Sequence, residues 1–237
     1  MFNKSPVFIG VEVLHSAGRL RKAYVYAALD ADRELLAIGQ GDQDEVLAYL
    51  GGQAAAVAAI CAPRSLKIGP ARQGEAQLMA DGFPLEATPG TLKGCPRWMK
   101  EGFDLFRRLD AFGYAPFPNP EADRLSLETR ADAVFWQVLG GKLPLPDSLE
   151  GRLQRQLILA DQGLPVPDAM EFFMEITRFK LVQGELPLEN IHTTEELSAL
   201  AAALVAWLAG CEPERIDLLG DPAGGQIALP KRPTNAL

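Results

Sequence analysis

Two apolar stretches of this 237-residue chain each carry a side chain that could do chemistry close to their end. The first, VFIGVEV, covers Val7–Val13 and holds a carboxylate at Glu12; the second, AAVAAICAP, covers Ala55–Pro63 and holds a thiol at Cys61. A carboxylate inside an apolar strand is costly unless it is paired or binds a cation. Glu12 is therefore a candidate site residue and metal ligand.

The simpler interpretation of Glu12 is a structural one. Its strand could end at the surface, where Arg19 or Arg21 would neutralise the carboxylate. Cys61 is most simply a small buried residue, because a catalytic thiol needs a nearby base and neither His15 nor His192 is close to it in sequence. Two histidines also argue against a histidine-rich zinc site and a Ser-His-Asp triad.

Two further carboxylates stand at the edges of predicted elements. Glu128 ends an alternating stretch, Arg124–Glu128, and Glu195 lies where a long apolar helix should begin. Either could contribute to an active site at the strand ends. The alternatives are a surface acid beside Arg130 for Glu128, and a capping or solvated residue for Glu195.

Basic residues flank the same predicted elements. Arg64 and Lys67 follow the strand that ends at Cys61, and Arg152 and Arg155 are three residues apart on one predicted helix. Guanidinium groups bind phosphate through two hydrogen bonds, so Arg64, Arg152 and Arg155 are candidate phosphate ligands. Ordinary surface charge, paired with acids such as Glu150, is the alternative.

Composition and charge limit the classes of function. The net charge is −8 and the hydrophobic content is 48%, which fits a globular protein and disfavours broad, sequence-independent binding to DNA. Three cysteines without CxxC spacing, and an N-terminus that lacks the pattern of a signal peptide, lead us to expect reduced thiols and a cytoplasmic location. The longest apolar segment, Leu197–Gly210, is too short to span a bilayer and is typical of a buried helix.

The first part of the chain is dominated by strands. Val7–Val13, Ala23–Leu29 and Glu34–Gln40 are joined by short turns, which predicts an antiparallel meander. A short helix, Glu45–Leu50, leads to a fully apolar fourth strand, Ala55–Cys61. The order of these elements predicts a mixed sheet that continues with parallel strands.

The remainder of the chain is mainly helical. The spacing of apolar residues and of turn residues predicts one more strand, six helices and a C-terminal β-hairpin: helices over Ala71–Asp81 and Arg97–Phe112, a strand over Arg124–Glu128, helices over Arg130–Leu139, Leu149–Asp161, Ala169–Gln183 and Glu195–Ala209, and a hairpin of Ile216–Leu219 with Gln226–Leu229. We therefore expect one α/β domain over residues 1–237, with a mainly helical insertion around 68–120.

Several sequence motifs together resemble a known family. They are FIGVEV, ICAP after the fourth strand, LSLET, SLEGRLQRQLIL, TTEELSALAAALVAWLA and the closing GDPAGGQIALP. Over about residues 7 to 230, the chain resembles a bacterial and archaeal family of unknown function that is described as predicted RNase H-like nucleases. The resemblance implies a ribonuclease H-like mixed sheet flanked by helices.

The resemblance also implies a two-metal site for Mg²⁺ or Mn²⁺ that is built from carboxylates. The family pattern places Glu12 where Asp is usual, Cys61 in place of the Asp of an Asp-Ala-Pro motif, and Ser198 in place of a helical Asp, whereas Glu128 is kept. Glu195, three residues before Ser198, could partly compensate. Glu12 and Glu128 are then the implied metal ligands, and Glu12, Glu128 and Glu195 the implied catalytic set.

We expect on this basis a metal-dependent nuclease or phosphodiesterase fold with a degenerate active site. The alternative is a non-catalytic scaffold that binds a nucleic acid, a nucleotide or a protein through the old cleft. A third possibility, an ATPase or sugar kinase of the wider superfamily, lacks the paired phosphate-binding hairpins that such enzymes need. The substrate and the oligomeric state are not indicated.

Overall fold

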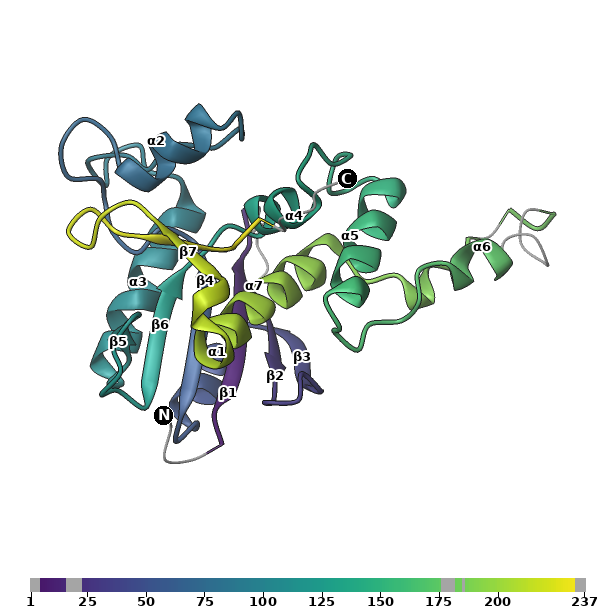
Figure 1. Ribbon diagram of the computed structural model, residues 1–237, viewed down its shortest axis with the longest axis horizontal. Helices are drawn as coiled ribbons and strands as arrows, with labels where there is room; N and C mark the ends of the chain where they lie inside the picture. The colour runs from purple at the N-terminus through teal and green to yellow at the C-terminus, as the bar shows by residue number, and fades with distance from the viewer. Residues whose placement is uncertain (1–4, 16–22, 176–181, 185, 233–237) are drawn as a thin grey trace.

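A mixed β-sheet forms the centre of the protein, as the computed structural model shows (Figure 1). The structure describes residues 5–15, 23–175, 182–184 and 186–232. The strands are β1 (Val7–Val13), β2 (Tyr24–Leu29), β3 (Leu35–Gly41), β4 (Ala56–Cys61), β5 (Ala115–Pro116), β6 (Arg124–Glu128), β7 (Ile216–Leu219) and β8 (Ile227–Pro230). Their order is β3-β2-β1-β4-β6-β8-β7, with β5 paired to β6.

The pairing of the strands confirms the predicted meander and the predicted hairpin. β1, β2 and β3 pair antiparallel, and β7 pairs antiparallel with β8. β4 pairs parallel with both β1 and β6, and β6 pairs parallel with β8. Because β1, β4 and β6 run in the same direction, their carboxyl ends meet at one edge of the sheet, where α/β proteins commonly bind ligands.

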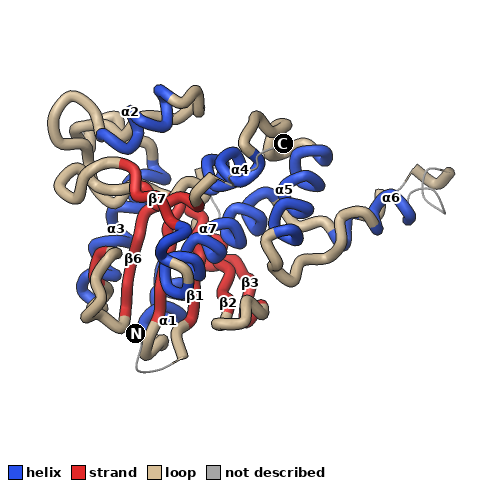
Figure 2. Tube along the Cα trace, in the orientation of Figure 1, coloured by secondary structure: helices blue, strands red, loops and turns tan. Residues whose placement is uncertain are grey.

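Helices cover both faces of this sheet (Figures 1 and 2). The helices are α1 (Gln43–Gly51), α2 (Gln73–Ala80), α3 (Arg97–Ala111), α4 (Ala131–Leu139), α5 (Leu149–Asp161), α6 (Glu171–Glu175) and α7 (Thr194–Cys211), with short 3-10 turns at Leu188–Asn190 and Pro213–Arg215. Alternate residues of β1 divide the core: Phe8 packs with α4 and α7, while Ile9 and Val11 pack with α1 and α3.

Helix α7 lies directly on β1. A Cβ atom at Gly10 would fall 2.0 Å from the carbonyl oxygen of Ala199, so only glycine permits this close approach. The buried stretch Leu197–Ala209 has one partly exposed residue, Ser198. The contact therefore fixes α7 over the sheet and places Ser198 near the ends of β1 and β4.

Most of helix α7 is buried, which bears on whether this apolar helix could span a membrane. The segment Leu188–Cys211 is long and apolar enough to cross a membrane by length and composition alone, but 67% of its most apolar window is buried within the fold. Such burial is typical of a core helix, as the sequence predicted for Leu197–Gly210.

Two predicted helices differ from the structure. A helix was expected over Ala169–Gln183, but α6 covers only Glu171–Glu175, residues 182–184 form a turn, and residues 176–181 lie outside the described part of the chain. Ala71–Asp81 shortens to Gln73–Ala80. The segment around 68–120, predicted as a mainly helical insertion, holds α2 and α3 joined by a long loop, and α3 completes the second core layer.

Candidate functional site

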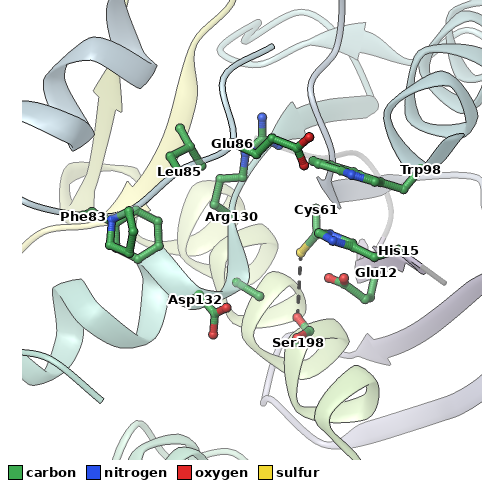
Figure 3. Close-up of a pocket in the computed structure, with 12 residues that line it drawn as sticks. Glu12, His15, Cys61, Phe83, Leu85, Glu86, Trp98, Arg130, Asp132 and Ser198 are labelled. Atoms are coloured by element: carbon green, nitrogen blue, oxygen red, sulfur yellow. Dashed lines mark hydrogen bonds between the residues drawn. The ribbon is translucent and has the colours of Figure 1, made fainter. Parts of the chain in front are cut away.

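A small cavity lies at the carboxyl ends of β1 and β4 (Figure 3). Glu12 and Cys61 are direct neighbours in the parallel pairing of these strands. The cavity has a volume of about 170 Å³. It is lined by Glu12, His15, Cys61, Phe83, Pro84, Leu85, Glu86, Trp98, Arg130, Ala131, Asp132 and Ser198. The sheet edge, the loop after α2 and the first turn of α4 thus meet at one place.

Glu12 lies at the floor of this cavity with an unusual protonation equilibrium. Burial raises the pKa of the Glu12 carboxyl from 4.5 to about 8; a hydrogen bond with Cys61 opposes the shift, and the charges of Asp132 and Glu195 add to it. Glu12 is thus largely an uncharged carboxylic acid at neutral pH, able to donate a hydrogen bond. Arg19 and Arg21, its alternative partners from the sequence, lie outside the described residues.

Cys61 and Ser198 complete the floor. The Cys61 thiol lies 3.9 Å from the carbonyl oxygen of Ser198 (Figure 3). The pKa of the Cys61 thiol is well above its usual value. Burial of the thiol is the main cause, and the nearby charge of Glu12 is the second. A thiol in this state is a poor nucleophile and a poor ligand for a hard cation, which agrees with the simple structural interpretation of Cys61.

Aromatic and cationic side chains form one wall of the cavity. His15 stacks on Trp98, with ring centroids 4.3 Å apart and planes 7° apart. Partial burial lowers the pKa of the His15 imidazole below its usual value, so it is mainly neutral at pH 7. The guanidinium carbon of Arg130 lies 5.9 Å from the centre of the Trp98 ring.

Glu128 is paired with arginine side chains and does not line this cavity. Arg72 Nη1 and Nη2 donate to the two oxygens of Glu128 at 2.8 and 2.6 Å, and both side chains are 1% exposed. The backbone N–H of Arg64 also donates to Glu128, at 2.8 Å. Arg130 Nη2 lies 3.0 Å from the same carboxylate. Both carboxylate oxygens of Glu128 are thus already engaged by protein donors.

A second buried acid balances the charge of this cluster. Arg72 Nη1 donates to Glu75 at 3.1 Å, Arg130 Nη2 lies 3.6 Å from Glu75, and the backbone N–H of Thr88 donates to the other Glu75 oxygen at 3.0 Å. Two arginines and two glutamates therefore share one interior site with no net charge. Such a buried cluster holds its geometry because each member would be costly to leave unpaired.

The three predicted phosphate ligands occupy separate places. Arg64 donates to Ser126 at 2.8 Å and pairs with Asp110. Arg152 donates to the backbone carbonyls of Ile191 and His192 at 2.7 and 2.8 Å. Both side chains therefore tie loops and strands together, and neither lines the cavity.

Arg155 is the predicted arginine that comes nearest to the cavity. Its Nη2 donates to Asp132 at 2.8 Å, and Asp132 is a lining residue. Its Nη1 donates to the carbonyls of Pro144 and Gly151. Arg155 therefore partly neutralises one acid of the cavity and holds α5 against the first turn of α4.

Glu195 is exposed on the first turn of α7 and is outside the cavity lining. The capping box of this helix uses Thr193 and Glu196, so Glu195 is not its capping residue. Glu195 still lies near enough for its charge to raise the pKa of Glu12. Among the residues that the structure describes, no group of three or more His, Cys, Asp or Glu side chains is arranged to hold a metal ion.

Sequence reasoning missed the residues that shape the cavity wall. Arg130 was considered only as a neighbour of Glu128, and Asp132, Phe83 and Glu86 carried no recognisable pattern. One signal was available: Arg130 directly precedes a helix and follows a buried strand, a junction at which α/β proteins place binding groups. The loop that supplies Phe83 and Glu86 gave no such signal.

Comparison with known proteins adds no further assignment. The chain matches no known family model, and no curated protein matches it.

Proposed function

We propose that this protein has a ribonuclease H-like fold with a degenerate nuclease site, and that its cavity binds a ligand without metal-dependent hydrolysis, in the cytoplasm. Two features support the fold assignment: the antiparallel meander β1-β2-β3, and the parallel placement of β4 and β6 beside β1. Both agree with the family that the sequence motifs resemble.

The engagement of Glu128 by Arg72 is the observation that carries this proposal. A metal ion at Glu128 would have to displace a two-bonded guanidinium in a side-chain pair that is 1% exposed. The buried Arg72 and Arg130 would then share the single negative charge of Glu75, and the one charge left unbalanced in the interior is strongly unfavourable. Glu128 is therefore assigned a structural role in place of the catalytic role implied by the resemblance.

The other members of the implied metal site do not restore the chemistry. Glu12 binds a cation only after losing a proton that its surroundings retain up to about pH 8. Cys61 and Ser198 supply no carboxylate beside it, and hard divalent ions are bound mainly through carboxylate and other oxygen ligands. The residues present do not fit a pair of Mg²⁺ or Mn²⁺ ions, so no catalytic step is derived through them.

The cavity also suits a small molecule better than a nucleic-acid strand. It has a volume of about 170 Å³, and its rim carries the exposed acids Glu86 and Asp132. The phosphodiester backbone of a nucleic acid is bound by clusters of basic residues. Among the described residues, this rim provides no such cluster.

A nuclease assay tests the proposed loss of activity. Single- and double-stranded DNA and RNA are incubated with the protein in millimolar Mn²⁺ or Mg²⁺, beside a Glu12→Gln variant purified in the same way. We expect no cleavage above the level of the variant, because any contaminating nuclease would act equally in both samples. Cleavage by the parent protein that disappears in Glu12→Gln would refute the proposal and support an active metal-dependent nuclease.

A further inference from the structure

A long segment between α5 and α7 projects from the body of the protein. We call residues 164–191 the arm; the structure describes 164–175, 182–184 and 186–191 of it, including α6. Figures 1 and 2 show α6 beyond α5, far from the sheet. The arm therefore presents its side chains away from the core that the rest of the chain forms.

Buried contacts with α5 hold the base of the arm. Gln156 of α5 is 0% exposed, and its Nε2 donates to the carbonyls of Pro167 and Asn190, both at 2.8 Å. Its Oε1 accepts from the backbone N–H of His192 at 2.9 Å. Phe172 of α6 is 3% exposed and packs into a small apolar cluster against α5. The base of the arm is thus fixed on α5 by specific interactions.

Apolar side chains are concentrated on the exposed surface of the arm. In the described part of the chain, twelve large apolar side chains are exposed, and six of them belong to the arm: Met170, Phe173, Met174, Val182, Leu186 and Leu188. Single exposed apolar residues are common on protein surfaces, whereas a concentration of them marks a site of interaction. The arm is therefore a candidate contact surface.

Three of these side chains lie on one face at α6. Met170, Phe173 and Met174 stand at positions i, i+3 and i+4, and they are 51%, 47% and 69% exposed. The intervening Phe172 is buried at the base of the arm, on the other side of the helix. Apolar residues with this spacing are the anchors by which an amphipathic helix binds in a groove of its partner.

A groove with matching apolar chemistry lies on α4. This α4 groove has a volume of about 410 Å³ and is formed by α4, by residues 82–84 after α2 and by residues 142–146 before α5. Its walls include Phe83, Trp136 and Leu145, and Leu145 is 77% exposed. Thioether sulfurs make favourable contacts with aromatic rings, so these walls suit the two methionine anchors of α6.

The charges of the two surfaces are also complementary. Glu171 and Glu175 flank the anchors on α6, and Lys142 is exposed in the lining of the α4 groove. The other charged side chains of the groove, Asp132 and Arg155, pair with each other at 2.8 Å. Lys142 therefore gives the groove a net positive charge that can face an acidic helix.

The groove and the arm that fits it come from two different copies of the chain. Figure 1 shows α6 pointing away from α2 and α4, so the arm does not reach the groove of its own copy. One short helix in one groove would bury little surface, because stable interfaces bury about 800 Å² on each partner. Two-fold symmetry makes the same contact twice and doubles the buried area.

We propose that two copies of this chain associate by a reciprocal exchange of arms, in which α6 of each copy places Met170, Phe173 and Met174 in the α4 groove of the other. This inference goes beyond the proposed function and does not depend on it. Phe83 and Asp132 line both the α4 groove and the cavity at the end of β1. The bound helix therefore borders the cavity of the other copy.

Sedimentation velocity of the intact protein, from micromolar to hundred-micromolar concentration, tests this inference. We expect a reversible dimer of the parent protein. Met174→Glu in the arm and Leu145→Glu in the groove should each raise the dissociation constant about tenfold or more, because each places a charge at an apolar anchor. A parent protein that stays monomeric over the whole range would overturn the proposal.

A matched control and a charge reversal connect the dimer to the proposed surfaces. Ile68 is 73% exposed in a loop that lines neither surface, and Ile68→Glu should leave the dissociation constant unchanged. Lys142→Glu should raise it about two- to fivefold, and adding Glu171→Lys should reverse that loss. Thermal unfolding curves verify that each variant is folded. Equal weakening by Ile68→Glu, or no effect of Lys142→Glu, would contradict the assigned contact.

An equimolar mixture of Met174→Glu and Leu145→Glu distinguishes arm-to-groove from arm-to-arm contact. Their heterodimer regains one intact contact, between the unaltered arm of Leu145→Glu and the unaltered groove of Met174→Glu. We therefore expect the mixture to associate more strongly than either variant alone. A mixture that associates no more strongly than its components, or a Leu145→Glu variant that dimerises like the parent, would overturn the groove assignment.

Discussion

Replacement of Glu128 by glutamine is expected to lower the free energy of unfolding by about 3–5 kcal/mol, because two buried arginines are then left with the single negative charge of Glu75. Glu128 and Arg72 are both 1% exposed and joined by two hydrogen bonds, and Arg130 lies 3.0 Å from the same carboxylate. Urea unfolding of the parent and the variant at neutral pH measures the difference.

An exposed ion pair provides the matched control. Glu212 pairs with Arg215 three residues along the chain, at side-chain exposures of 35% and 51%. Glu212→Gln removes the same charge and should cost less than about 1 kcal/mol. A Glu128→Gln variant as stable as this control would contradict the structural role of Glu128 and return it to the list of candidate metal ligands.

Replacement of Glu12 by glutamine is expected to stabilise the protein increasingly as the pH rises. The folded state raises the pKa of Glu12 from 4.5 to about 8, so the parent must either keep a proton or bury a charge. Below about pH 4.5, Glu12 is protonated in both the folded and the unfolded protein, so the pKa shift does not change the free energy of unfolding there. The penalty grows as the pH rises towards about 8 and is complete above it, where it reaches on the order of 5 kcal/mol.

Urea unfolding of Glu12→Gln and of the parent at both ends of this pH range measures their difference in stability. It checks whether the variant becomes the more stable protein as the pH rises. Glu121→Gln, in an exposed loop, controls for the loss of one negative charge. A difference between Glu12→Gln and the parent that stays constant with pH, or that favours the parent at high pH, would show that Glu12 is ionised in the folded protein. That result would make Glu12 a stronger candidate for binding a cation.

The arrangement of the sheet could be predicted because local patterns determine it. The connecting segments after Val7–Val13 and after the second strand are too short for a crossover and leave only antiparallel pairing, and the apolar run Ala55–Cys61 requires burial on both faces. The region after Gly163 was harder, because only some of its apolar residues face a core: Phe172 is buried, whereas Met170, Phe173 and Met174 are 51%, 47% and 69% exposed. Helical spacing of apolar residues predicts a helix only where a partner surface exists.

The candidate site could be predicted only in part, for a related reason. Glu12, Cys61 and Ser198 come together because strand order and the contact of Gly10 with α7 place them, and sequence motifs reflect that order. The role of Glu128 depends on its ion pair with Arg72, which lies in a separate loop 56 residues earlier in the chain. Such long-range pairing leaves no spacing signal in a single sequence.

Calorimetric titration of Mn²⁺ into the purified protein at neutral pH, with Glu12→Gln alongside, tests the central claim most directly. The claim is that the Glu128 carboxylate is committed to Arg72 and Arg130, and that Glu12 is committed to a retained proton. It predicts no saturable binding at millimolar Mn²⁺ in either protein. Stoichiometric Mn²⁺ binding to the parent that is lost in Glu12→Gln would contradict it and place a metal ion at the end of β1.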